Sequence, residues 1–248
     1  MIEMKMKFDR RRVVLMIALF FAVQAYGQTD GLGTWNVLTG KLTFNKKLFT
    51  MAEVQVRSQH MYKDFTYYEY KAGIGYNFPK SLSAMLAMGH YMTYDPLIPG
   101  NFKGNVLNNE FRIWEQFVLE NNINRVKIEH RYRIEQRFTS TGYKNRFRYR
   151  LNTIIPLNHV KVQPKTWFLS VFDEVFINNE SPFLEQNRIF LGAGYELNKN
   201  LTFLGGYINR FDNGGGTNQI WKNFFQINAI LSFDEFKSGR EKMPSALD

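Results

Sequence analysis

Polar and apolar side chains alternate along much of this chain, most sharply in the stretch RVKIEHRYRIEQRF, residues 125–138. Every second residue there is charged, from Arg125 to Arg137, and the positions between them are mostly aliphatic or aromatic. Successive side chains of a β-strand point to opposite faces of a sheet, so a period of two predicts a strand whose faces meet different surroundings. Residues 65–78 and 144–156 show the same alternation.

Segments of this kind follow one another beyond Gln28, where no stretch has a convincing helical period. Turn-rich breaks separate them, as expected for consecutive strands. Eleven segments can be distinguished: 33–44, 48–59, 65–78, 81–94, 107–120, 125–138, 144–156, 165–177, 186–197, 200–211 and 219–233. The sequence therefore predicts an all-β fold.

The connections between these segments differ in kind. Every second one is tight, as in NKK at Asn45, PKS at Pro79, NNIN at Asn121 and NKN at Asn198, although LNHVKVQP from Leu157 is longer. The other connections are mostly longer and polar or rich in glycine, such as PLIPGNFKGN and NGGGTN. Short turns at one rim and longer loops at the other are typical of an up-and-down antiparallel β-barrel.

The alternation also indicates what each face of the barrel meets. A soluble barrel would bury the apolar set and leave more than a dozen charges outside, with no helix to cover anything. A transmembrane barrel places the apolar set toward lipid and the charges toward the interior, and closure leaves no backbone group unpaired in hydrocarbon. We expect the second arrangement, with Tyr68, Tyr76, Phe78, Phe138 and Tyr195 as candidates for interfacial aromatic belts.

The number of strands is less direct to infer, because bacterial single-chain barrels have even numbers of strands. Eleven segments are visible, so either a short strand precedes Gly33 or a connection hides one. We predict about 12 strands, with 10 as the alternative.

The first 27 residues differ from the rest. Five basic residues precede the apolar run VVLMIALFFAV, and Ala25 and Gly27 supply small residues before Gln28, which is the order of a cleaved signal peptide. The alternative is an uncleaved anchor, but the run of 11 residues is short of the roughly 20 that span a bilayer. We predict a signal peptide at 1–27, a barrel at 28–233 and a polar tail at 234–248.

Composition narrows the partners. The chain contains no cysteine, which excludes a disulfide framework, a thiol nucleophile and an acylated cysteine. Its net charge of +10 falls to +7 without the signal peptide, which carries five basic and two acidic residues. Nucleic acid is not an expected partner, because an exported chain does not normally meet it and the charges do not form runs.

An ordered set of motifs resembles one known family. The pieces are WNVLTGKLTFNKKL, YKAGIGYNFPKSL, NEFRIWEQF, IEHRYRIEQRF, KNRFRYRLN, VFDEVFIN and LGAGYELNKNLTFLGGYINRF. In this order they resemble the outer-membrane barrels catalogued as domain of unknown function 2490. The resemblance implies a β-barrel in the outer membrane of a Gram-negative bacterium, with membrane lipid and the barrel-assembly machinery as partners and no known activity. One departure is the tail that follows Phe233, where such barrels commonly end.

The strongest candidate for function is the predicted interior. By parity its cations are Arg57, Lys71, Arg112, Arg125, Lys127, Arg131, Arg133, Arg137, Arg146, Arg148, Arg150 and Arg188, and its anions are Glu53, Glu69, Glu110, Glu129, Glu135, Glu174 and Glu196. The candidate site is the cluster Arg112, Glu129, Arg131, Arg133, Glu135, Arg137, Arg146, Arg148, Arg150 and Glu174. If segments 125–138 and 144–156 pair, Glu135 lies near an arginine of the second segment, and Arg133 lies beside another arginine.

Three functions fit such an interior. Ion pairs that brace a narrow barrel are the first, and a porin-like channel or binding site for small anionic solutes is the second, because rings of cations favour anions. The third is a lipid-modifying enzyme on the outer wall, for which His130 is the histidine to inspect. No serine lies at a suggestive spacing from it, and metal-ligand or phosphate-loop spacings are missing from the sequence. We therefore predict no catalytic residue, no metal and no cofactor.

Overall fold

The structure is a computed structural model of the chain, and it describes residues 31–234. The predicted signal peptide at 1–27 lies outside the described residues, as does the polar tail beyond Asp234. Residues 31–234 contain no helix that is long and apolar enough to cross a membrane.

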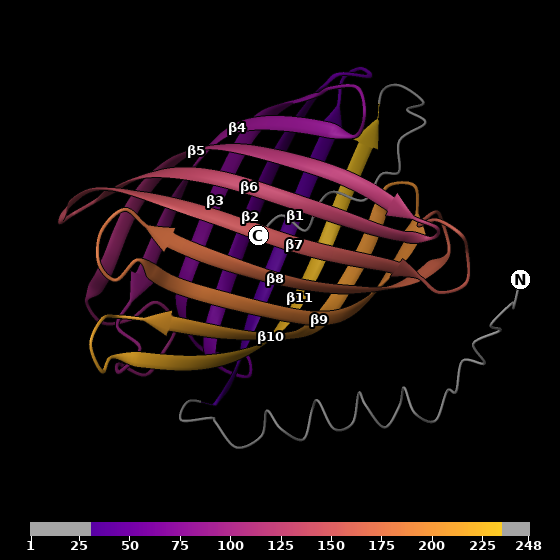
Figure 1. Cartoon of the computed structure of the whole chain (residues 1–248). Helices are drawn as coiled ribbons and strands as arrows, with labels where there is room; N and C mark the ends of the chain where they lie inside the picture. Colours follow the sequence, from indigo (N-terminus) through magenta and orange to yellow (C-terminus); the bar gives the residue numbers. More distant parts are fainter. Residues whose placement is uncertain (1–30, 235–248) are drawn as a thin grey trace, which may run out of the picture.

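Eleven β-strands follow one another along the described chain (Figure 1). They are β1 (Leu32–Thr43), β2 (Leu48–His60), β3 (Lys63–Asn77), β4 (Leu82–Tyr94), β5 (Val106–Ile123), β6 (Val126–Thr139), β7 (Gly142–Pro156), β8 (Thr166–Asn178), β9 (Leu184–Asn198), β10 (Leu201–Asn213) and β11 (Gln219–Asp234). Each pairs with its sequence neighbours in antiparallel fashion, and the sheet closes on itself. The predicted all-β, up-and-down barrel is thus confirmed.

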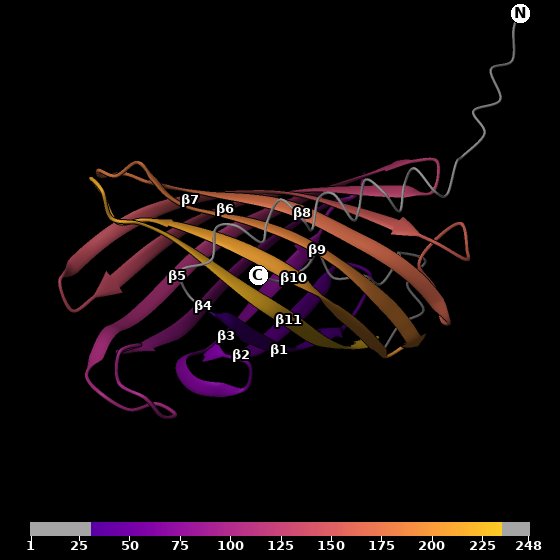
Figure 2. The same cartoon turned by 90° about the horizontal axis from the view of Figure 1, so that it is seen from below.

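The predicted number of strands is wrong: within residues 31–234 the barrel closes with eleven strands, neither 12 nor 10. In an up-and-down barrel with an odd number of strands, the first and last strands run in the same direction. The structure meets this condition with a parallel pair between β1 and β11, in which Leu32 lies opposite Asn223 and Thr43 opposite Asp234. Figure 2 shows these two strands side by side. The even-number rule failed because it assumes an antiparallel seam.

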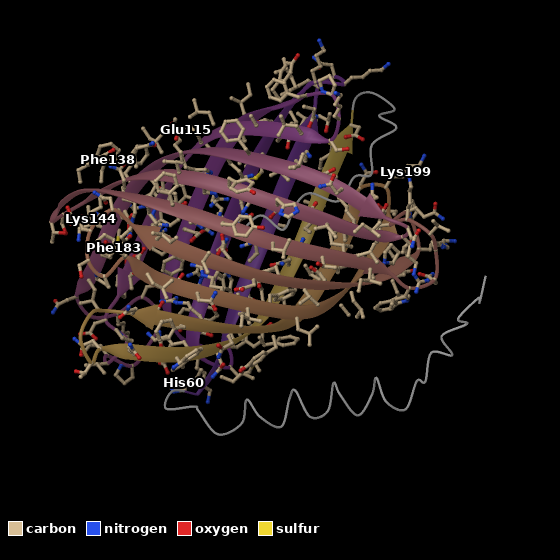
Figure 3. The ribbon with its side chains drawn as sticks, in the orientation of Figure 1. His60, Glu115, Phe138, Lys144, Phe183 and Lys199 are labelled. Atoms are coloured by element: carbon tan, nitrogen blue, oxygen red, sulfur yellow. The ribbon has the colours of Figure 1, made fainter. Side chains whose placement is uncertain are left out.

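The connections between the strands form two rims, one at each end of the barrel. We call them the Lys199 rim, formed by connections 44–47, 78–81, 124–125, 157–165 and 199–200, and the Phe183 rim, formed by 61–62, 95–105, 140–141, 179–183 and 214–218. Figure 3 labels the residues that give the rims their names. The expected contrast in length is weaker than predicted, because the strands that flank 61–62 and 140–141 leave only two residues to each turn. The described chain enters at the Phe183 rim and leaves at the Lys199 rim.

The outer face of the barrel is apolar on all eleven strands. Each strand has at least one large hydrophobic side chain that is at least about one third exposed. In strand order, one such residue each is Leu38, Val54, Ile74, Leu86, Phe117, Tyr132, Phe147, Val171, Ile189, Phe203 and Phe225. Most of the charged residues that alternate with them are almost completely buried inside, from Lys127 to Glu135 on β6 and from Arg146 to Arg150 on β7. The faces are therefore inverted with respect to a soluble barrel.

Apolar side chains also fill part of the interior, which sequence analysis did not predict. One buried cluster includes Trp35, Phe168, Phe172, Phe190 and Phe224, and a second includes Met51, Met85, Tyr91 and Trp114. Inward glycines make room for these rings: a Cβ added at Gly194 would lie 2.0 Å from Cζ of Phe168. The interior is therefore a packed core with a charged centre.

Candidate functional site

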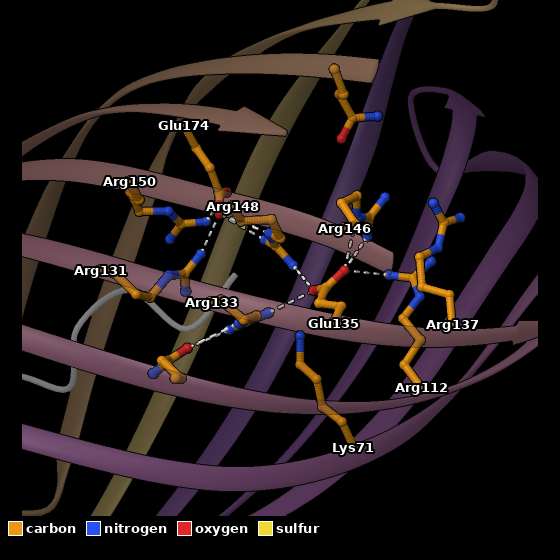
Figure 4. A network of polar contacts seen from close by, with 12 residues as sticks. Lys71, Arg112, Arg131, Arg133, Glu135, Arg137, Arg146, Arg148, Arg150 and Glu174 are labelled. Carbon is orange, nitrogen blue, oxygen red and sulfur yellow. Dashed lines mark hydrogen bonds and ion pairs between the residues drawn. The ribbon is translucent and has the colours of Figure 1, made fainter. Parts of the chain in front are cut away.

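The charged centre is built by β5 to β9, whose inward residues form neighbouring rows. Adjacent strands place Glu135 of β6 opposite Arg146 of β7, and Arg150 of β7 opposite Glu174 of β8. Because side chains directly opposite each other lie within contact distance, the register alone brings these groups together. Figure 4 shows the resulting network.

Glu135 is the first hub of the network. Its Oε2 accepts hydrogen bonds from Nη2 of Arg146 at 2.5 Å and Nε of Arg146 at 2.8 Å. Its Oε1 accepts from Nη1 of Arg148 at 2.7 Å and from Nη1 of Arg133 at 3.5 Å. Arg112 adds an ion pair at 3.9 Å to Oε2. Four guanidinium groups thus share one fully buried carboxylate.

Glu174 is the second hub. Its Oε1 lies 2.6 Å from Nη2 of Arg131 and 2.9 Å from Nη2 of Arg148, and its Oε2 lies 2.6 Å from Nη2 of Arg150. Arg148 therefore touches both hubs and joins them (Figure 4). Arginine suits this position because its planar fork presents several donors in fixed directions.

The network continues toward the Phe183 rim through two more glutamates. Glu110 accepts from Arg112 at 2.6 Å and from Arg137 at 2.5 Å. Glu185 contacts Arg137 at 2.9 Å and Arg146 at 3.0 Å. Glu185 lies at an irregularity of the β8–β9 ladder, where Ile177 pairs with Leu184 but Phe176 pairs with Gln186, so Glu185 is an extra residue. Such a bulge redirects a side chain that strict alternation would send outward.

Two further groups of ion pairs lie elsewhere in the interior. Glu129 contacts Nζ of Lys127 at 3.0 Å and accepts from Nδ2 of Asn152 at 2.9 Å. On β2 and β3, Nζ of Lys71 lies 2.6 Å from Glu53 and 2.7 Å from Glu69. The first group shares one carboxylate between two donors, and the second shares one ammonium group between two carboxylates.

Aromatic rings border the arginines. The guanidinium carbon of Arg148 lies 4.4 Å from the centroid of Phe176, and that of Arg112 lies 3.7 Å from the centroid of Tyr91. Arg133 faces Trp114 at 5.2 Å and also donates from Nη2 to Oε1 of Gln116 at 2.7 Å. Rings hold cations by electrostatic attraction to their faces, so the apolar clusters and the charged centre pack as one unit.

Inside the barrel, cations exceed anions around the two hubs. Six arginines surround Glu135 and Glu174: Arg112, Arg131, Arg133, Arg146, Arg148 and Arg150. Each is at most 8 % exposed. The arrangement can lock neighbouring strands together, and its surplus positive charge also suits a small anion.

The structure brings most of the predicted interior residues together but moves one and adds others. Arg125 was assigned to the interior and is instead an exposed residue of the two-residue turn 124–125. Glu185 was not among the predicted residues because it lies at the bulge, and Gln116 was not among them because it carries no charge. The same parity places Gln116 on the inward face of the strand that carries Arg112, whereas nothing in the alternation reveals Glu185.

The sequence comparison identifies the family. The family described as "Protein of unknown function (DUF2490)" matches residues 32–220, from β1 to the start of β11. The chain belongs to this family. No curated protein and no solved structure matches it significantly. The matched region includes every residue of the two hubs, so the charged centre lies within the part of the chain that defines membership.

The outer wall of this family member carries a few polar groups. Nδ1 of His130 lies 2.9 Å from the hydroxyl of Tyr149, and the two rings stack with centroids 6.2 Å apart. Glu115 accepts from Nε2 of Gln136 at 3.0 Å. Beside these residues lies an apolar hollow of about 420 Å³ lined by Phe117, Tyr132, Ile134, Phe147, Tyr149 and Ile177, together with strand residues Arg133 and Arg148. Within residues 31–234, His, Asp and Glu side chains form no group of three suited to a metal ion.

Proposed function

We propose that this protein is an integral outer-membrane β-barrel whose charged centre braces a narrow, packed interior. One observation carries the proposal: every strand exposes large apolar side chains outward, while charged side chains are buried inside. In water the outer face would be a very large apolar surface, whereas in a bilayer it meets hydrocarbon. Lipid and the barrel-assembly machinery are then its partners, in the outer membrane of a Gram-negative bacterium.

The polar groups of the outer wall are compatible with hydrocarbon because they have partners. Glu115 is bonded to Gln136, and the exposed Asp173 accepts from Nδ2 of Asn187 at 2.6 Å. A polar group that is satisfied within the protein costs much less in a bilayer than one that is left alone. On this wall the described hydrogen-bond partner of the His130 ring is the hydroxyl of Tyr149.

Bracing is favoured over conduction by the way the interior is filled. The two hubs are 0 % exposed, and aromatic rings such as Phe176 and Trp114 occupy the space beside the arginines. A conducting lumen of this charge would leave cations in contact with water, as in anion-selective pores. In this interior the cations are instead paired with carboxylates. Stabilisation of the barrel by these ion pairs is therefore the simplest function.

Fractionation tests the membrane location. After expression in a Gram-negative host, the mature protein is expected in the outer-membrane fraction, resistant to carbonate extraction, and compact on a gel unless it is heated. Recovery as a free periplasmic protein would refute the proposal. For the interior, purified protein in planar bilayers is expected to give no steady conductance at neutral pH, and reproducible channels would contradict bracing.

The surplus of arginines favours a second candidate, the capture of a small anion at the charged centre. The connected network contains seven arginines, the six around the hubs and Arg137, but four glutamates, the two hubs with Glu110 and Glu185. The difference leaves positive charge that a bound anion would neutralise. If this occurs, sulfate raises the unfolding temperature above the value in chloride at equal ionic strength, and this increase is smaller in Arg148→Gln, which keeps only the general stabilisation by sulfate. An equal increase in both proteins would contradict anion capture.

A further inference from the structure

The two rims of the barrel differ in charge. All charged residues in the five connections of the Lys199 rim are basic: Lys46, Lys47, Lys80, Arg125, Lys161, Lys165 and Lys199. All seven are exposed. Each connection contributes at least one of them, so positive charge follows the rim from β1 to β10, whereas β11 ends there with Asp234.

The Phe183 rim has no such surplus. Its five connections contain one cation, Lys103, and two anions, Asp95 and Glu180. Both rims belong to one chain of net positive charge, so composition alone does not account for the contrast. The asymmetry therefore points to an anionic partner at the Lys199 rim.

Aromatic side chains lie next to these cations on the outer wall. The rings of Trp167 and Tyr195 have centroids 4.7 Å apart, and those of Tyr76 and Phe78 are 4.8 Å apart. Nζ of Lys47 lies over the ring of Tyr76 at 5.9 Å. Aromatic residues of membrane proteins concentrate at the level of the lipid headgroups, between hydrocarbon and water. The cations lie just beyond that level, where lipid phosphates are found.

We propose that the Lys199 rim binds the headgroups of anionic phospholipids in the leaflet that surrounds it. This inference rests on the proposed membrane location. A lipid fits better than a protein partner because headgroups surround a barrel and the cations follow ten of its eleven strands, whereas a protein would contact one sector that carries few of them. Lysine suits this contact because it is a flexible point charge that needs no fixed geometry.

Two exposed tryptophans provide separate reporters for the two rims. Trp167 is 53 % exposed beside the Lys199 rim, and Trp221 is 46 % exposed beside the Phe183 rim. The other two tryptophans, Trp35 and Trp114, are 0 % exposed and contribute a constant background. The variant Trp221→Phe therefore reports on the Lys199 rim, and Trp167→Phe reports on the opposite rim.

The experiment measures quenching of tryptophan fluorescence by brominated lipids. The two variants are reconstituted in phosphatidylcholine vesicles that contain the same fraction of either brominated phosphatidylglycerol or brominated phosphatidylcholine. At Trp167 we expect the anionic lipid to be preferred by about fivefold, the factor expected from a single cation near a membrane surface. High salt reduces this preference, because it screens exposed charges. At Trp221 the two lipids are expected to quench equally.

Removing the cations near Trp167 completes the test. The triple variant Lys161→Gln, Lys165→Gln and Lys199→Gln is expected to lose most of the preference for the anionic lipid. A matched triple, Lys63→Gln, Lys103→Gln and Lys144→Gln, removes three exposed cations near the Phe183 rim and should leave the preference at Trp167 unchanged. Equal quenching by both lipids at Trp167 in the unmodified rim would overturn the inference. Absence of quenching by either lipid at both reporters would instead refute the membrane location.

Discussion

Arg133 of β6 lies directly opposite Arg148 of β7, on the inner face of the barrel. Two like charges in this position destabilise a sheet unless a counter-charge separates them. Glu135 supplies that charge, because its Oε1 accepts hydrogen bonds from Nη1 of Arg148 at 2.7 Å and from Nη1 of Arg133 at 3.5 Å. The hub carboxylate is therefore what allows the two arginines to remain neighbours in a buried space.

The first prediction follows from this shared counter-charge: Glu135→Gln destabilises the barrel more than Arg148→Gln. Loss of the carboxylate leaves four arginines without their common anion, and breaking a buried ion pair in this way costs about 3–5 kcal/mol. Loss of Arg148 costs less, because Glu135 keeps Arg146 and relief of crowding offsets part of the loss. The measurement is the temperature at which the compact band on a gel gives way to the unfolded band.

Lys144→Gln is the control for this comparison, since it removes an exposed cation of β7, the strand that carries Arg148. We expect its transition temperature to match that of the original protein. If Glu135→Gln were as stable as this control, the charged centre would not brace the barrel.

The second prediction concerns the seam. Leu38 of β1 lies opposite Ala229 of β11. The chain contains no cysteine, so Leu38→Cys with Ala229→Cys introduces the sole pair, and we expect it to form a disulfide under mild oxidation. The readout is a change of mobility on a denaturing gel that reducing agent reverses.

A neighbouring pair provides the control for the seam. Phe203 of β10 lies opposite Ala229 but one strand further from Leu38. Strands are about 4.8 Å apart, so Leu38→Cys with Phe203→Cys spans about twice that distance and should not close. Failure of the first pair while the folded barrel persists would indicate that another strand lies between β1 and β11.

The third prediction tests whether the interior is packed. A methyl group added at Gly194 would meet the ring of Phe168 at 2.0 Å, whereas one added at Gly205 would meet its nearest neighbour at 3.9 Å. Gly194→Ala should therefore cost about 1–3 kcal/mol of stability, the usual range for overpacking a core. Gly205→Ala should be neutral by urea unfolding in detergent. Equal tolerance of both would show an interior with spare room.

Periodicity predicts the strands of this barrel well, because each side chain meets either the packed interior or the outer surroundings. It could not predict the closure, since the pairing of β1 with β11 depends on strand direction around the whole ring. It also missed Glu185, which a bulge turns inward. Part of the aromatic core could have been predicted, because Phe168, Phe172 and Phe176 share the parity of Glu174 and therefore point inward.

The last prediction decides whether the outer wall faces lipid or water, with two positions on β7 that differ mainly in depth. Tyr143 and Phe147 both point outward and are 52 % and 54 % exposed, so in water an arginine at either position would be tolerated equally. Tyr143 is the second residue of the strand, whereas Phe147 lies four residues further from the Phe183 rim. For a strand tilted by about 45°, four residues correspond to roughly 9 Å along the bilayer normal.

An arginine near the midplane costs about 2–4 kcal/mol, and one near the interface costs about 0–1 kcal/mol. Phe147→Arg should therefore fold poorly into vesicles, measured as the fraction of compact band after refolding, while Tyr143→Arg folds as the original protein does. Equal yields from the two variants would mean that β7 does not cross a membrane.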